Sequence, residues 1–267
     1  MIHASTSVTL RGATAFPSII MNTARIFSFG LVVAALVGNL TAKVEPVPPG
    51  TRPKWDMDYG PFLNLTVQMP GENPGSTPKG LAVRVGSPFA GTVVYDTDLL
   101  RCTGGWTGGF LDLKGVAFNG SHGGNPGPVG SVVFRTSATP GWSKAGSFSD
   151  PRELPKGFGA STVPFGPLPK QWAQYRGLYR NGERVTVWYT VGTAEILESP
   201  GIEGEGDGAA LTRSFHVRSA GEASTVLVAE VLEDAALEER DGCVVLRDNA
   251  SKADSRLVLH AAGTPVG

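Results

Sequence analysis

The sequence has little of the chemistry that metals and cofactors require. Among 267 residues it has two cysteines, Cys102 and Cys243, and four scattered histidines. Neither cysteine begins a Cys-x-x-Cys pair, which excludes haem attachment of the Cys-x-x-Cys-His type and leaves a structural zinc site without support. The Gly-x-Ser-x-Gly motif of a serine nucleophile is also absent. We therefore expect no metal site and no cofactor.

Basic runs are lacking as well. The chain has 23 Lys and Arg against 24 Asp and Glu, a formal net charge of −1. Phosphate binding needs a concentrated basic surface, so a nucleic-acid partner is excluded. The 36 Gly and 20 Pro are typical of a turn-rich chain, but 41% hydrophobic residues are too many for a disordered one. The composition predicts a folded protein.

One long apolar segment is present, Met21 to Ala42, and it has the parts of a bacterial export signal. Arg25 supplies the basic region, Ile26 to Val37 the apolar run, and Leu40 to Ala42 a small-residue cleavage site. We expect the signal to be cleaved, which places the protein in the periplasm or outside the cell with no stable membrane span.

Two alternatives exist for this segment. The acid-free region before Glu45 also has the composition of an organellar transit peptide. A retained anchor is the other alternative, although the 17 uncharged residues between Arg25 and Lys43 are at the short limit for a spanning helix. Because the signal lies inside the chain, residues 1–20 are predicted to be an over-extended start, with translation beginning at Met21.

A proline-rich linker, residues 43–54, is expected to separate the signal from one folded domain at 55–267. The domain consists of short β-branched and aromatic runs separated by Gly, Pro, Asn and Asp, which predicts an all-β fold, an antiparallel β-sandwich with long Gly/Pro-rich loops. The predicted strands are 62–68, 80–85, 92–96, 109–118, 131–136, 174–180, 183–191, 195–198, 211–217, 225–231, 243–247 and 256–260.

Two hairpins have local signatures. Asn181-Gly182 offers two residues that accept positive φ, as a type I′ turn requires, and Asp241-Gly242 offers a second such pair. In the first hairpin Val185, Val187, Tyr189 and Val191 alternate with Thr186, Trp188 and Thr190. The first set predicts a core face, and the second predicts a partly aromatic surface or a second packing layer.

Two Gly/Pro-rich stretches, 119–130 and 139–169, are unusually long for loops. Loops of this length in compact domains generally serve a site or lie packed across the surface.

Aspartates spaced two apart recur at Asp56 and Asp58 and at Asp96 and Asp98. On a strand each pair would present both carboxylates on one face, as a cation or ligand site requires. The alternative is that they are turn residues making Asx contacts. We take Asp96 and Asp98 as candidate ligand-binding residues.

Trp106 and His122 are two further candidates. Trp106 lies between glycine pairs, so it is either an exposed platform for a sugar ring or a core residue beside tight turns. His122 follows Ser121, but adjacent loop residues do not make a nucleophile and base. No catalytic residue is assigned.

Cys102 and Cys243 would pair as one long-range disulfide in an oxidising compartment, or remain two buried thiols. The spacing alone does not choose between them.

Several short runs resemble a domain of unknown function: Trp55 to Leu63, Tyr95 to Arg101 leading into Gly105 to Phe110, and Tyr175 to Tyr179 with Tyr189 to Gly192 and Ile196 to Glu198. That domain opens large secreted proteins of planctomycetes and their relatives, where it commonly precedes c-type cytochrome modules. The likeness covers Trp55 to the C-terminus and implies no catalytic residues. Trp55 and Tyr59, at its start, join the candidate ligand-binding residues. Since this chain has no haem-attachment motif, a redox role would belong to neighbouring modules.

The sequence thus predicts a non-catalytic extracytoplasmic accessory module. It would bind a ligand, such as a carbohydrate, or dock to partner domains of a secreted or cytochrome-linked system. The alternative is a glycan-active hydrolase or lyase that uses an aspartate with His122.

Overall fold

The structure, a computed structural model, describes residues 7–13, 15–23, 31–36, 58–70, 76–87, 89–113, 124–154, 163–204, 209–218, 224–230, 235–240, 243–248 and 256–261. For 7–36 and 235–261 only the course of the strands is described.

The described elements are strands, and all of their pairings are antiparallel. In chain order they are β1 (Ser7–Ala13), β2 (Ala15–Thr23), β3 (Leu31–Leu36), β4 (Phe62–Val67), β5 (Thr77–Val85), β6 (Gly91–Asp96), β7 (Arg101–Thr107), β8 (Leu111–Asp112), β9 (Gly127–Pro128), β10 (Ser131–Arg135), β11 (Ala173–Asn181), β12 (Arg184–Val191), β13 (Ala194–Glu203), β14 (Ala210–Arg218), β15 (Ser224–Glu230), β16 (Ala235–Arg240), β17 (Cys243–Asp248) and β18 (Arg256–Ala261). The predicted all-β class is confirmed.

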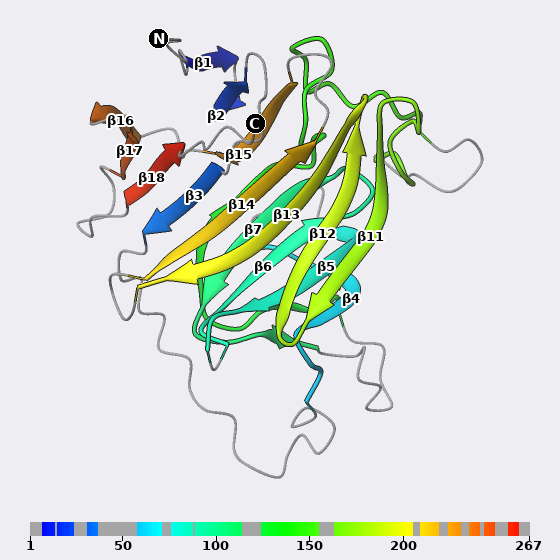
Figure 1. Ribbon diagram of the computed structural model, residues 1–267, viewed down its shortest axis with the longest axis vertical. Coiled ribbons are helices and arrows are strands. Elements are labelled where there is room, and N and C mark those ends of the chain that lie inside the picture. Colours follow the sequence, from blue (N-terminus) through cyan, green and yellow to red (C-terminus); the bar gives the residue numbers. More distant parts are fainter. Residues whose placement is uncertain are drawn as a thin grey trace.

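Two sheets form the body of the molecule. One has the order β10-β7-β6-β5-β4, and the other has the order β11-β12-β13-β14-β3-β18-β17-β16. Figure 1 shows β11 to β14 as one layer in front of β4 to β7. Side chains from both layers share one buried cluster, which includes Val83 and Val93 from the first sheet and Val187 and Ile196 from the second. The arrangement is therefore a sandwich.

The alternation predicted for β12 is confirmed. Val185, Val187, Tyr189 and Val191 are buried, whereas the residues between them are only partly buried. A smaller apolar cluster covers the other face of the five-stranded sheet, where Trp106 packs with Met69 and Val94. Both faces of that sheet are therefore shielded from water along β5 to β7.

A buried ion pair lies between the two sheets. Glu198 of β13 accepts a 2.6 Å bond from Arg213 Nε of β14 and a second 2.6 Å bond from the hydroxyl of Tyr189. Trp142 Nε1 in turn donates to that hydroxyl at 3.2 Å. Burial first, then the Glu198 charge, raises the pKa of Tyr189, which keeps the hydroxyl as a donor. Although burial opposes its charge, Glu198 raises the pKa of Arg213.

The hairpin of β11 and β12 is present, but its turn differs from the predicted type. Asn181 pairs with Arg184, so the loop is Gly182-Glu183, and of its two residues only Gly182 has positive φ, at 60°. A glycine at the first central position is typical of a type II′ turn and not of type I′. Gly192, with φ 56°, occupies the same position between β12 and β13. The β16–β17 hairpin is confirmed by the pairing of Arg240 with Cys243.

Strand β7 was not predicted, because its glycines are typical of turns. A side chain at Gly104 would meet the Phe134 carbonyl oxygen at 2.6 Å, and one at Gly105 would meet Leu211 at 2.6 Å. The glycines thus permit close packing on both faces of a strand. In the predicted strand 109–118 only the two residues of β8 are strand, and 114–118 lie outside the described residues.

Part of the segment predicted as a signal is included in the sheets. β2 pairs with β1 and β15, and β3 pairs with β14 and β18. Export and cleavage remain predictions from the sequence. Within the residues that the structure describes, no helix is long and apolar enough to cross a membrane.

Cys102 is a buried free thiol in the described part of the chain. Burial raises its pKa to about 12. The alternative of a buried thiol holds for Cys102, and the side chain of Cys243 lies outside the described residues.

The Glu198–Arg213 pair gives a direct test of the sandwich. Glu198→Gln leaves the Arg213 charge buried without a counterion, and we expect it to lower the free energy of unfolding by about 3–5 kcal/mol. Urea unfolding of the purified protein measures the change. The matched control is Glu195→Gln, which removes the partly exposed pair with Arg218 at 3.6 Å and should cost less than about 1 kcal/mol. Equal losses in both variants would contradict this role.

Candidate ligand pocket

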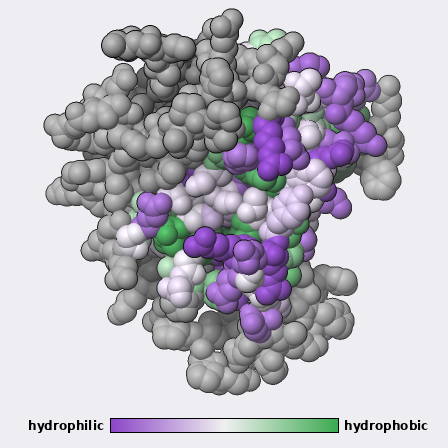
Figure 2. Space-filling model, viewed as in Figure 1, coloured by the Kyte–Doolittle hydropathy of each residue, from purple (hydrophilic) through white to green (hydrophobic). Residues whose placement is uncertain are grey.

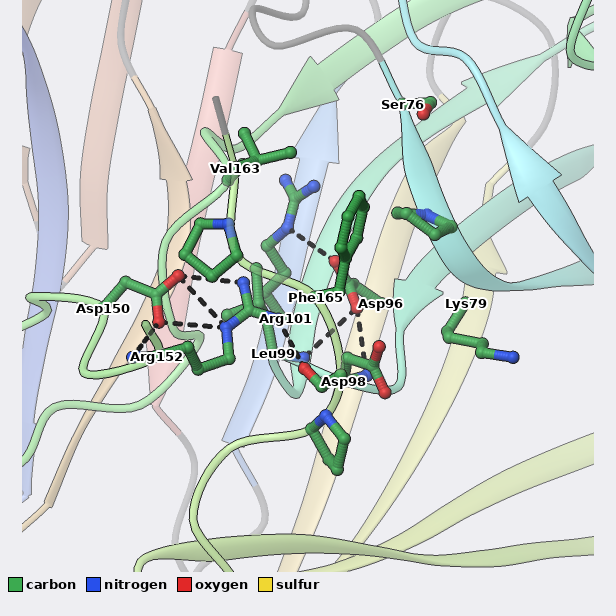
Figure 3. Close-up of a pocket in the computed structure, with 15 residues that line it drawn as sticks. Ser76, Lys79, Asp96, Asp98, Leu99, Arg101, Asp150, Arg152, Val163 and Phe165 are labelled. Atoms are coloured by element: carbon green, nitrogen blue, oxygen red, sulfur yellow. Dashed lines mark hydrogen bonds and ion pairs between the residues drawn. The ribbon is translucent and has the colours of Figure 1, made fainter. Parts of the chain in front are cut away.

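A pocket of about 290 Å³ opens at the end of the sandwich where β6 turns into β7. Figure 3 shows Asp150 and Arg152 on one side of it and Lys79 on the other, with Phe165 between them. The volume is at the small end of the range for ligand sites, which suits a ligand of about one ring. The pocket is lined by Ser76, Pro78, Lys79, Asp96, Asp98, Leu99, Arg101, Ala138, Asp150, Arg152, Val163, Pro164, Phe165, Gly166 and Pro167.

The hairpin loop between β6 and β7 forms the floor of the pocket. Asp96, the last residue of β6, accepts hydrogen bonds on Oδ1 from the backbone N–H groups of Asp98 at 3.0 Å and Leu99 at 3.2 Å. These are the Asx contacts that the sequence offered as the alternative for this pair. Leu100 ends the loop with φ 49°, a left-handed conformation that costs a residue with a side chain about 1–2 kcal/mol.

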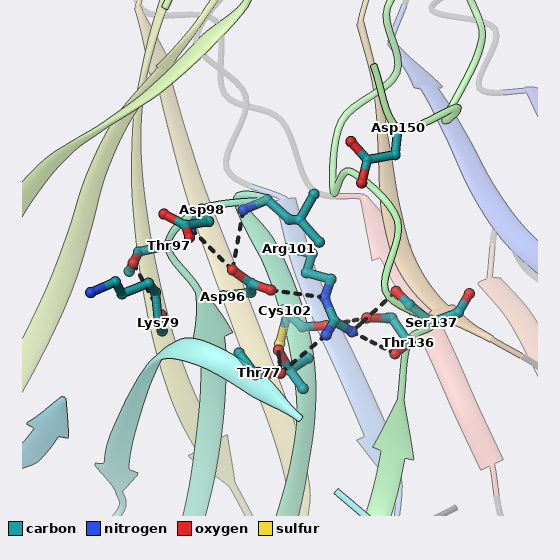
Figure 4. A network of polar contacts seen from close by, with 12 residues as sticks. Thr77, Lys79, Asp96, Thr97, Asp98, Arg101, Cys102, Thr136, Ser137 and Asp150 are labelled. Carbon is teal, nitrogen blue, oxygen red and sulfur yellow. Dashed lines mark hydrogen bonds and ion pairs between the residues drawn. The ribbon is translucent and has the colours of Figure 1, made fainter. Parts of the chain in front are cut away.

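Arg101 holds this loop from below. Its side chain is 1% exposed, and its Nε lies 3.5 Å from Asp96 Oδ2. Nη1 donates to the carbonyl oxygens of Thr136 at 2.7 Å and Ser137 at 3.1 Å, and Nη2 donates to Thr77 Oγ1 at 3.1 Å. Figure 4 shows the guanidinium between Asp96 on one side and Thr136 and Ser137 on the other. One cation thus joins β5, β6 and the segment after β10.

The long loop 139–169 supplies the opposite wall. Arg152 binds Asp150 through both Nε and Nη2, with an Nη2 to Oδ2 distance of 2.8 Å. This two-point geometry fixes both side chains. The backbone N–H of Leu168 donates to the Asp98 carbonyl at 3.0 Å and ties the loop to the floor. Phe165 remains 55% exposed, so it offers an apolar ring at the pocket rim.

Asp98 is the carboxylate that remains available. Burial raises its pKa from the ordinary 3.8, the neighbouring Asp96 raises it further, and Arg152 and Lys79 partly offset the shift. Among the described residues no hydrogen bond reaches its carboxylate, and Lys79 forms no ion pair. These two groups are therefore available to a ligand, whereas Asp96, Asp150 and Arg152 are engaged within the protein.

The charges of the lining balance. Lys79, Arg101 and Arg152 are matched by Asp96, Asp98 and Asp150. Beside them stand Phe165 and three prolines, which give an apolar wall. A site with one open acceptor, one open donor and one aromatic ring suits a neutral, hydroxyl-rich molecule with an apolar face.

The structure brings together only some of the residues predicted from sequence. Asp96 and Asp98 line the pocket, and Tyr59 does not. Trp106 is 0% exposed and its Nε1 donates to the carbonyls of Gly109 and Phe110, so it is a core residue and not a sugar platform. Trp55 and His122 lie outside the described residues, as does Asp56. Asp58 is exposed and accepts a bond from the Gly60 N–H at 2.8 Å, an Asx contact.

Sequence reasoning did not identify Lys79, Arg152 and Phe165 as site residues. The length of the loop 139–169 was the available signal, because such loops often serve a site. In the described part of the chain, no three His, Cys, Asp or Glu side chains are grouped closely enough to hold a metal ion.

Residues 93–198 match a family described as a domain of unknown function (DUF6797). The matched segment runs from β6 to β13 and includes every lining residue of the pocket except Ser76, Pro78 and Lys79. No curated protein and no solved structure shows significant similarity to the chain. The match confirms a domain of unknown function within the stretch that the sequence motifs indicated.

The raised pKa of Asp98 predicts a pH-dependent stability. Because the folded chain binds the proton more tightly than the unfolded chain, the stabilisation is complete below about pH 4 and is lost as pH rises through the folded pKa. Asp98→Asn removes this loss, so its melting temperature should equal or exceed that of wild type at about pH 7. The difference should vanish below about pH 4. Thermal melts of both proteins across this range measure it, and a variant less stable than wild type at neutral pH would show that the carboxylate stabilises the fold.

Proposed function

We propose that this protein is a non-catalytic, exported accessory module that binds a small, neutral carbohydrate unit in the pocket beside Asp98. The observation that carries the proposal is the pocket itself: an open carboxylate, an open ammonium group and an exposed phenyl ring around a charge-balanced cavity. A sugar ring has hydroxyls for Asp98 and Lys79 and an apolar face for Phe165.

The setting of the module follows from the sequence. The export signal favours the periplasm or the cell exterior, and the resemblance to domains in large secreted proteins favours docking to partner domains, including those of cytochrome-linked systems. In that setting the module would hold a glycan unit near a partner that acts on it.

The alternative is a glycan-active hydrolase or lyase that uses an aspartate and His122. Asp98 gives this alternative its one specific support, because a carboxyl with a raised pKa is suited to acid–base chemistry. Asp96 is a poor candidate, since Arg101 and two backbone N–H groups already engage it.

Calorimetric titration with a panel of neutral monosaccharides tests the proposal, with free amino acids as a zwitterionic comparison. Phe165→Ala should weaken monosaccharide binding about tenfold through loss of the stacked ring. Leu154→Ala is the matched control, because Leu154 is 54% exposed on the same loop and does not line the pocket. It should leave affinity unchanged.

Equal affinity in the Phe165 variant and wild type would contradict the proposal, and so would binding of amino acids in place of sugars. Turnover of a glycan that is lost in both Asp98→Asn and His122→Ala, with binding retained, would establish the enzymatic alternative.

A further inference from the structure

A second surface stands on the outer face of the eight-stranded sheet. The register of β12 places Trp188 opposite Gly177 of β11 and Leu197 of β13. Because Val187 and Tyr189 point into the core, Trp188 points away from it. Tyr179 pairs with Thr186 and therefore lies on the same outer face.

Trp188 and Tyr179 form an aromatic pair. Their ring centroids are 5.7 Å apart and their planes differ by 31°. Tyr179 is 54% exposed, so its ring is accessible from solvent. The guanidinium of Arg176 lies over the Trp188 ring, 5.7 Å from its centroid, in a cation–π contact.

Gly177 adds no side chain beside the indole of Trp188. A directly opposite residue on the neighbouring strand would pack against Trp188, but glycine has no side chain to do so. A Cβ added at Gly177 would meet no atom within 4 Å in the described part of the chain. The same residue has φ 148° at a bulge in β11, a conformation that favours glycine.

The surroundings of the pair are polar. Thr186 and Ser199 share a 2.7 Å hydroxyl contact, and Arg176 donates to Gln174 at 3.0 Å. Trp188 Nε1 is buried and finds no acceptor among the described residues. Figure 2 shows this face as mostly pale and purple with separate small green areas.

The size and polarity of this surface distinguish between a protein partner and a polysaccharide. A stable protein interface needs about 800 Å² on each partner with an apolar centre, and Tyr179, Trp188 and Leu197 are too few to provide it. A chain of sugar rings needs one aromatic face at a time and hydroxyl partners beside it.

We propose that this aromatic surface, Trp188 and Tyr179 with Arg176, binds an extended polysaccharide chain, independently of the pocket. The site lies on another face of the sandwich from Asp98 and would hold polymer while the pocket takes a single unit.

Co-sedimentation with cellulose and affinity electrophoresis in xylan and alginate test the inference. Trp188→Ala and Tyr179→Ala should each weaken retention by at least one of these polymers about tenfold, and Trp188→Phe, which keeps a ring, should restore part of it. Tyr179→Ala removes an exposed side chain, so it reports on binding even if the Trp188 variant fails to fold. Leu154→Ala, an exposed residue that belongs to neither site, is the control and should retain polymer as wild type does.

Absence of retention by all three polymers, or retention that survives both the Trp188 and Tyr179 substitutions, would overturn the inference. Loss in Phe165→Ala alone would assign polymer binding to the pocket instead and would also overturn it. Sedimentation velocity tests a further outcome. If the wild-type protein is a dimer, binds no polymer, and becomes a monomer in Trp188→Ala, the surface is a self-association interface and the inference is overturned. Monosaccharide titration of the pocket remains a separate readout, so failure here does not decide the proposed function.

Discussion

The guanidinium of Arg101 carries a charge into the interior at the point where the pocket begins, and the shape of the pocket depends on its partners. A buried cation is tolerated only when it is paired and its N–H groups are satisfied. Asp96 supplies the opposite charge 3.5 Å from Nε, and Thr77 with the carbonyls of residues 136 and 137 accepts bonds from Nη1 and Nη2, which fixes the ends of β5 and β6 and the segment after β10. With Asp96 held in this way, the next carboxylate along the chain, Asp98, is left facing the cavity.

The contacts that stabilise the fold lie apart from the features at the pocket that lower its stability. The Glu198–Arg213 pair, with Tyr189, links β12, β13 and β14 of the eight-stranded sheet in the buried core, and Trp142 joins it from the segment after β10. At the pocket the chain accepts a left-handed Leu100 and a half-buried Asp98 whose ionisation opposes folding. Features that cost stability and persist are typical of sites shaped for binding, and here they sit on a hairpin loop that a well-packed sandwich supports.

Periodicity in the sequence was enough for the regular strands and not for the site. The alternation of β12 and the two hairpins follow from local residue types. Gly104 and Gly105 hid strand β7 from sequence analysis, because glycine marks turns as often as it permits close packing. Pro200 lies inside β13 at a point where the pairing with β12 has already ended, so its missing N–H costs no hydrogen bond to β12. The pocket could not be predicted, since Phe165 and Arg152 reach Asp98 only through the path of a long loop.

Backbone amide chemical shifts, followed by NMR during titration with neutral monosaccharides, report directly on whether a sugar binds in the pocket. We predict that a sugar that binds will move the resonances of residues 96–101 and 163–168, the floor and the wall joined by the bond from Leu168 to Asp98. Shifts confined to other parts of the sandwich, or no shift with any monosaccharide of the panel, would contradict the assignment of the pocket as a carbohydrate site.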